Sequence, residues 1–221
     1  MQIPNAADLT ATPIVDFNPS TFTETSTNGA TATASTGEVW TLNSTGAKPA
    51  QIVKSASLLF DGTDDFMLTA SFAVSQPITT YAVWKQVTWS STDTVYEGST
   101  NTAGYNRLTQ QATTPALKFD ASGNAGGISA ENTNLAVGFY GITTTIANGA
   151  GGLFQVNATT AITGNYGVQG ITNGILLAAD TGGLARQANV QFKEFLIFNA
   201  AHTAAEQAIV RNYLNAKHRI Y

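Results

Sequence analysis

The sequence predicts an all-β fold, a two-sheet antiparallel sandwich closed by one C-terminal α-helix. Short runs of β-branched and aromatic residues recur along the chain, with Gly, Asn and Asp turn signals between them at intervals of about 8 to 12 residues. The long run Val190–Phe198 is typical of a central strand, because it begins by alternating apolar and polar residues and ends continuously apolar. The one helical pattern lies at the end of the chain.

The expected strands follow from these runs in chain order. They span residues 14–17, 38–42, 57–60, 66–72, 78–89, 93–97, 106–111, 116–119, 135–146, 153–156, 175–178 and 190–198. Asp61-Gly62 is a strong hairpin signal, since Gly accepts the positive φ that a tight turn needs, so we expect strands 57–60 and 66–72 to form a hairpin. A second hairpin is expected at the glycine-rich residues 148–152.

The closing helix has clear signals at both ends. Thr203 and Glu206 form a capping box, in which each side chain bonds the backbone N–H of the other residue. An apolar stripe should face the sheet, and cations in the last turn suit the C-terminal dipole. The stripe comprises Ile209, Val210, Tyr213 and Leu214, and the cations are Lys217, His218 and Arg219.

The size of the chain favours a single folded domain. Its 221 residues are 43% hydrophobic, which is enough for one large β-domain with a sizeable core. Residues 1–13 contain Pro4 and scattered small residues, so we expect an N-terminal arm there and a sandwich domain over residues 14–221. No shift in composition indicates a second domain.

The charge pattern excludes some partners. Charged residues make up 11% of the chain, well below the usual quarter, which suits a packed assembly whose contacts would desolvate charge. The net charge is −4 without a basic patch, so no nucleic-acid partner is expected. There is no long apolar run and no secretory signal, so we expect no membrane association. Without cysteine there is no disulfide and no Cys-ligated zinc.

Four segments in order resemble one fold family, the concanavalin A-like (laminin G/pentraxin-type) jelly rolls, in versions found in bacteriophage structural proteins. They are Gly37–Trp40 with Ser44–Gly46, the "FDGxDDyl"-like Leu59–Met67, the core-strand-like Phe192–Asn199, and the closing helix from His202 to Leu214. The resemblance covers roughly residues 14–221. It implies two curved antiparallel sheets of about six or seven strands each. It implies no single function, because this fold hosts lectins, glycosidases, adhesion modules and virion proteins.

Three carboxylates, those of Asp61, Asp64 and Asp65, lie within five residues and could hold Ca²⁺, which prefers several oxygen ligands. Pentraxin-type relatives bind calcium through acidic and amide side chains. The alternative is that Asp61 caps the turn while the other two accept backbone N–H bonds. Because no second acidic cluster offers the remaining ligands, we expect the carboxylates to serve the turn, and we predict no metal and no other cofactor.

A glycosidase would need paired carboxylates, and the chain offers one weak pair. Asp93 and Glu97 lie four residues apart in a predicted strand, which places them about 13 Å apart and too far for a retaining or inverting pair. The two histidines, His202 and His218, lie at the two ends of the helix, so a Ser-His-Asp triad is not expected. We therefore predict a non-enzymatic protein.

Sugar binding would use aromatic faces beside amide and hydroxyl groups on exposed loops or a concave sheet. The best local candidates for a glycan site are Trp89, Tyr96, Tyr105, Asn106 and Arg107, near Asn101. The alternative is that Trp89 and Tyr96 are ordinary core aromatics.

These observations together predict a structural protein of a bacteriophage particle, either a capsid decoration or a fibre component. It would be made in the host cytoplasm and located in the virion. Its expected partners are other virion proteins, further copies of itself and host surface glycans. A stand-alone carbohydrate-binding lectin module is the alternative, and a glycoside hydrolase is a third hypothesis.

Overall fold

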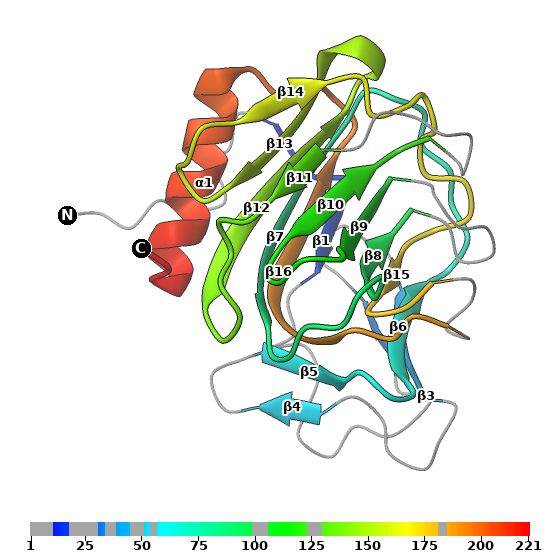
Figure 1. The fold of residues 1–221 in the computed structure, drawn as a ribbon. Coiled ribbons are helices and arrows are strands. Elements are labelled where there is room, and N and C mark those ends of the chain that lie inside the picture. Colours follow the sequence, from blue (N-terminus) through cyan, green and yellow to red (C-terminus); the bar gives the residue numbers. More distant parts are fainter. Residues whose placement is uncertain are drawn as a thin grey trace.

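The computed structural model describes residues 11–17, 31–33, 39–44, 51–53, 57–98, 106–122, 130–180 and 185–221. These residues form two antiparallel sheets that face each other, with one α-helix, α1 (Ala204–His218), packed on the outer face of the first sheet (Figure 1). The predicted two-sheet sandwich with one C-terminal helix is therefore confirmed. Within the described ranges each sheet has eight strands, more than the six or seven that the resemblance implied.

Sheet A is built around a long central strand. Its spatial order is β14 (Ile162–Gly164), β13 (Gly152–Val156), β12 (Tyr140–Ala147), β7 (Ile78–Gln86), β16 (Asn189–Phe198), β5 (Ser57–Asp61) and β4 (Gln51–Val53), and β1 (Val15–Phe17) also pairs with β16. Sheet B has the order β11 (Ala130–Asn132), β10 (Leu117–Asp120), β9 (Arg107–Gln110), β8 (Thr94–Glu97), β15 (Leu176–Leu177), β6 (Asp65–Thr69), β3 (Val39–Ser44) and β2 (Thr31–Thr33).

The core between the sheets is rich in aromatic rings. Trp40 of sheet B packs against Phe17 and Phe195 of sheet A, with ring centroids 4.8 and 6.3 Å apart. Tyr96 of sheet B contacts the same Phe195 at 5.2 Å. All four rings are buried. Burying each such side chain stabilises the fold by about 1.5–3 kcal/mol, so these contacts hold the two sheets together.

The helix covers the other face of β16. Leu196 and Phe198 point away from the main core and are buried in a second apolar cluster with Val210, Tyr213 and Leu214 of α1. This second cluster explains why β16 ends in a continuous apolar run, as the sequence predicted.

The prediction that Ile209 belongs to the buried stripe of the helix was wrong. Ile209 is 36% exposed, because the buried positions 210, 213 and 214 follow i, i+3, i+4 spacing and residue 209 lies beside that stripe. The capping box is confirmed, since the Thr203 N–H donates to Glu206 at 2.7 Å and the Glu206 N–H donates back to the Thr203 hydroxyl at 3.4 Å.

The hairpin predicted at Asp61-Gly62 is wrong. β5 pairs with β4 and β16 in sheet A, whereas β6 pairs with β3 and β15 in sheet B, so the turn carries the chain from one sheet to the other. Gly62 does have the expected positive φ, +78°. A corner between sheets needs that backbone just as a hairpin does, and the local sequence cannot specify which distant strands β5 and β6 join.

Other expected elements differ mainly at their ends. β6 ends at residue 69, β7 ends at residue 86 and β12 begins at residue 140, so residues 70–76, 87–89 and 135–139 are not in strands. The hairpin at residues 148–152 is confirmed: it joins β12 to β13 through the short 3₁₀ helix Gly149–Gly151. Residues 1–10 of the expected arm lie outside the described residues. In the described part of the chain, no helix is long and apolar enough to cross a membrane.

Candidate functional site

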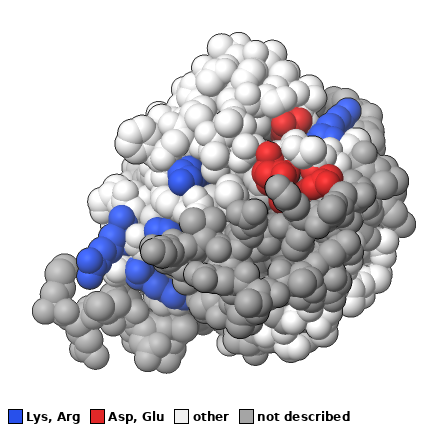
Figure 2. Space-filling view, turned by 90° about the horizontal axis from the view of Figure 1, so that it is seen from below, with Lys and Arg blue, Asp and Glu red and all other residues white. Residues whose placement is uncertain are grey.

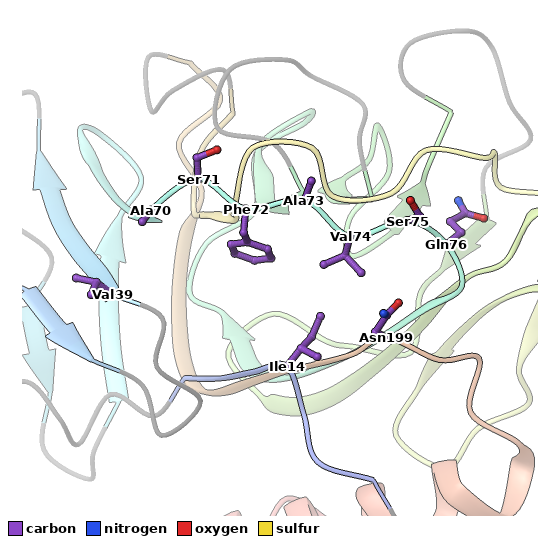
Figure 3. A pocket seen from close by; sticks show the side chains of 10 residues that line it. All are labelled: Ile14, Val39, Ala70, Ser71, Phe72, Ala73, Val74, Ser75, Gln76 and Asn199. Atoms are coloured by element: carbon purple, nitrogen blue, oxygen red, sulfur yellow. The ribbon is translucent and has the colours of Figure 1, made fainter.

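An open pocket of about 860 Å³ lies beside the segment that follows β6 (Figure 3). Its volume is in the range of small-ligand sites, about 300–1,000 Å³. Its lining residues are Ile14, Val39, Ala70, Ser71, Phe72, Ala73, Val74, Ser75, Gln76 and Asn199. The pocket therefore combines residues next to β1, β3, β6 and β16, which brings together parts of both sheets.

The segment 70–76 is extended, so its side chains alternate. Phe72 and Val74 are half-buried and pack against the core, as does Ile14, and Figure 3 shows all three side chains directed into the pocket. Backbone bonds fix the segment in place: the Val74 N–H donates to Ile171 at 2.9 Å, and Gly174 donates to Phe72 at 2.8 Å. The pocket thus has an aromatic and aliphatic wall on a firmly held backbone.

The polar side chains of the pocket differ in how many hydrogen bonds they already make within the protein. The Gln76 amide donates to the Gly167 and Gln169 carbonyls at 3.0 and 2.8 Å, and its oxygen accepts from Gly149, so this side chain is occupied. Asn199 and Ser75 are exposed, and Figure 3 shows the Asn199 amide directed into the pocket. The Ser71 hydroxyl is occupied, because it donates to Asn173, and Figure 3 shows the Ser71 and Ser75 hydroxyls on the side of the segment away from Phe72. An amide beside an aromatic ring can bind the hydroxyl groups and the apolar face of a sugar.

Among the described residues, none that lines this pocket is a carboxylate, histidine, lysine or cysteine. General acid–base and nucleophilic catalysis need such groups within hydrogen-bond reach of the reacting atoms. The described lining can therefore bind a neutral ligand, but it offers no side chain that would cleave one.

The sequence-predicted glycan residues lie elsewhere and do not form one site. Tyr96 is 1% exposed, and its hydroxyl bonds Thr145 at 2.7 Å inside the core, so its ring cannot face a sugar in this structure. Trp89 is half-buried just after β7. Tyr105 and Asn101 lie outside the described residues.

Asn106 and Arg107 are adjacent at the start of β9, and both are buried. Arg107 lies opposite Asp120 of β10, with 3.8 Å between Nη2 and Oδ2. Within the described chain, its Nε and Nη1 and the Asn106 Oδ1 have no hydrogen-bond partner. These groups form a buried polar row rather than an open sugar platform.

The structure places the predicted carboxylate pair at the two ends of β8: Asp93 precedes the strand and Glu97 is its last residue. The charged neighbour that raises the pKa of Asp93 is Asp180. Burial raises the pKa of Asp93, a bond from Ser90 lowers it, and Asp180 raises it further. Asp180 itself pairs with Arg186 at 3.3 Å. A carboxyl of raised pKa beside a second carboxylate is an arrangement that glycosidases use.

The three acidic residues of the β5–β6 turn have ligand atoms within 4.8 Å of one another. Two of them bond the turn itself: Asp61 Oδ1 accepts from the Thr63 N–H at 2.8 Å, and Asp65 Oδ2 accepts from the Asp61 N–H at 3.2 Å. Burial raises the pKa of Asp65 to about 7, and the charges of Asp61 and Asp64 add to this. Figure 2 shows acidic side chains gathered on one side of the lower face with a basic side chain beside them, while most of the other Lys and Arg side chains in this view lie on the opposite side.

Sequence reasoning missed the residues that line the pocket. Residues 66–72 were predicted to be one strand and no prediction covered residues 73–76, so neither Phe72 nor Val74 was identified as a pocket residue. The available signal was the alternation of the large apolar residues Phe72 and Val74 with the small residues Ser71, Ala73 and Ser75. Ile14 and Asn199 join the pocket only through the fold.

Comparison with solved structures identifies proteins of similar fold. The chain is similar to Trypanosoma rangeli sialidase, with a TM-score of 0.62 and 12% identity, over 87% of this chain and 32% of that one. It is also similar to a structure of botulinum neurotoxin type C, which depends on interaction with two ganglioside molecules to enter cells; the TM-score is 0.64 and the identity 11%, over 95% and 53% of the two chains. The binding domain of botulinum neurotoxin serotype D gives a TM-score of 0.64 at 11% identity, over 93% and 52%.

These similarities establish the β-sandwich fold. This chain spans about a third of the sialidase and about half of the neurotoxin chains. No protein-family model and no curated protein matches the sequence.

Proposed function

We propose that this protein is a non-enzymatic, lectin-like carbohydrate-binding module, and that the Phe72 pocket is its sugar site. The observation that carries the proposal is the lining of this pocket, whose described part joins an aromatic ring and aliphatic walls to the Asn199 amide without any acid or base. Such a lining fits a neutral saccharide, whose C–H face packs on the ring while its hydroxyl groups bond the amide. Ganglioside interaction by a structural neighbour is consistent with this reading.

A glycan array tests the proposal. The wild type should bind at least one class of neutral glycan, and Phe72→Ala should lose at least about tenfold in affinity, as expected for loss of an aromatic contact. Phe139→Ala is a matched control, because Phe139 is 69% exposed and lies outside the pocket lining. If no glycan binds, or if both variants bind like the wild type, the proposal fails.

A bacteriophage particle is the proposed setting of the module, as a capsid decoration or fibre component. The support is the resemblance of four ordered segments to phage jelly rolls and the low charged fraction of 11%. Mass spectrometry of purified particles tests this setting. The chain should be present in stoichiometric amounts with other virion proteins, and its absence would remove the setting without affecting the sugar site.

Glycoside hydrolysis is the second candidate function, and the specific observation that favours it is the raised pKa of Asp93, to which burial and the charge of Asp180 contribute. The carboxylate of Asp180 is already neutralised by Arg186, which is why we rank binding above catalysis. Hydrolysis of aryl glycosides that is abolished by Asp93→Asn would favour the enzyme. No turnover by the wild type on glycans that it binds would favour the binding module.

A further inference from the structure

A second group of side chains lies on the other sheet, away from the Phe72 pocket. The Tyr140 ring on β12 has two ammonium groups beside it: Lys85 Nζ on β7 lies 4.9 Å from the ring centroid, and Lys193 Nζ on β16 lies 4.1 Å from it. Tyr140 and Lys85 are direct cross-strand partners. Three neighbouring strands of sheet A therefore place one ring and two positive charges at a single point.

The backbone of β16 is arranged to present Lys193 there. The register of β16 on β7 shifts between Phe192 and Glu194, which marks a β-bulge at Lys193. A bulge places an extra residue opposite one partner residue and re-aims its side chain, and bulges are frequent beside binding and active sites. Phe192 points into the core, so the bulge lets Lys193 and Glu194 both lie on the outer face.

Hydrogen bonds among buried polar side chains hold the Tyr140 ring in position. Its hydroxyl hydrogen-bonds the Ser57 side chain, and Ser57 Oγ also accepts from Gln191 Nε2 at 2.7 Å. Ser57 and Gln191 are buried. These hydrogen bonds fix the position of the ring, so the two lysine ammonium groups contact a rigid side chain.

The two positive charges have no carboxylate partner among the described residues. No Asp or Glu oxygen in that part of the chain lies within 4.0 Å of Lys85 or Lys193, whereas the adjacent Glu194 is already paired with Lys217 at 2.8 Å and with His218 at 2.5 Å. Burial and the neighbouring Lys85 ammonium both lower the pKa of Lys193, so the two charges oppose each other. An anion placed between them would relieve this repulsion.

We propose that Lys85, Tyr140 and Lys193 bind the anionic group, a carboxylate or a sulfate, of an acidic saccharide on the outer face of sheet A. Two ammonium groups can each donate a charge-assisted hydrogen bond to one oxyanion. The half-buried Tyr140 ring, beside the two ammonium groups, supplies an aromatic surface for the sugar ring. This site is separate from the Phe72 pocket and does not depend on the proposed function of that pocket.

Isothermal titration calorimetry tests the proposal with four probes: 3′-sialyllactose for the carboxylate, a heparin-derived tetrasaccharide for the sulfate, inorganic sulfate as the bare anion, and lactose as the neutral control. The wild type should bind at least one acidic probe at least about tenfold more tightly than lactose, which can bind only in the Phe72 pocket. The double variant Lys85→Met with Lys193→Met should lose at least about tenfold in affinity, because a hydrogen bond to a charged group contributes about 1.5–3 kcal/mol.

Three controls separate this site from alternatives. Arg219→Asn removes one positive charge at the exposed end of α1 and should leave binding within about threefold, as for an exposed charge pair. Phe72→Ala should leave acidic binding unchanged, since it alters only the other pocket. Circular dichroism and thermal melting confirm that each variant is folded.

Several outcomes would overturn the proposal: no binding of either acidic probe, equal binding of inorganic sulfate and the tetrasaccharide, unchanged affinity in the double variant, or an equal loss in Arg219→Asn. The preference between sialyllactose and the tetrasaccharide assigns the anion as carboxylate or sulfate.

Discussion

The carboxylate of Asp65 accepts a hydrogen bond from the backbone N–H of Asp61 at 3.2 Å, across the turn that carries the chain from sheet A to sheet B. Asp65 is 2% exposed, and its second oxygen, Oδ1, is buried without a hydrogen-bond partner in the described part of the chain. Burial raises its pKa from 3.8 to about 7. The turn between the two sheets therefore contains a carboxyl group whose ionisation destabilises the folded state.

The unfolding free energy should depend on pH through Asp65. Its folded-state pKa is raised, so its contribution is fully present below pH 3.8, the unfolded value, and is lost as the pH rises through about 7. Asp65→Asn should remove this dependence. Relative to the wild type, the variant should gain roughly 1–3 kcal/mol in urea-measured stability between pH 4 and pH 8.

Glu131→Gln is the control for that measurement, because Glu131 is an exposed carboxylate on β11. Its stability difference from the wild type should change little over the same pH range. An Asp65→Asn profile parallel to that of the wild type would contradict the account of this carboxyl group.

Gly62→Ala should strongly destabilise the crossover turn. Gly62 has φ +78°, and a Cβ atom there would lie 2.8 Å from Cβ and 2.9 Å from the backbone nitrogen of Asn189 on β16. Gly149→Ala is a matched control, because Gly149 also has a positive φ, +48°, but has open space around it. We expect about 1 kcal/mol for Gly149→Ala, from backbone strain alone, and at least about 3 kcal/mol for Gly62→Ala. Similar losses in urea unfolding would show that the close approach to β16 is unimportant.

Glu194→Gln should loosen the C-terminal end of α1. The Glu194 side chain is 1% exposed and pairs with Lys217 and His218, which are partly exposed at 33% and 12%. Losing the carboxylate leaves the Lys217 ammonium without its partner and removes the oxygen that His218 contacts, and we expect a loss of about 2 kcal/mol, less than for a fully buried pair. Glu206→Gln at the other end of α1 should cost about 1 kcal/mol or less, as a capping change. Hydrogen exchange of residues 213–218 should speed up only in Glu194→Gln.

Tyr96→Phe should affect stability and leave ligand binding unchanged. The variant loses the hydroxyl bond to Thr145 at 2.7 Å inside the core, which we expect to cost about 1 kcal/mol. Any glycan bound by the wild type should bind the variant with the same affinity. A selective loss of glycan affinity at unchanged stability would restore Tyr96 as a sugar-binding residue.

The fold could be predicted largely because its signals are local. The capping box at Thr203, the turn at residues 148–152 and the apolar run of β16 each follow from short-range chemistry. The pairing of β5 and β6 could not be predicted in this way, because the same glycine turn serves a hairpin and a corner between sheets. Strand ends were also misjudged, since residues 70–76 keep strand-like alternation while bonding to residues 171–174 outside any regular strand.

The candidate sites depend on contacts between distant segments. The Phe72 pocket needs Ile14 and Asn199, which are far apart in the sequence. The Lys85–Tyr140–Lys193 group needs the bulge in β16, which no local pattern marked. Composition did identify useful residue types, but Tyr96 shows that an aromatic residue in a strand is as readily a core residue as a sugar platform.

Hydrogen–deuterium exchange with a bound glycan tests the central claim most directly, because it locates the ligand. Saturating the protein with a neutral glycan from the array should slow exchange in residues 70–76 and near Asn199, and should do so in Phe139→Ala but not in Phe72→Ala. Protection confined to residues 106–110, or no protection anywhere at saturation, would contradict the assignment of the Phe72 pocket as the sugar site.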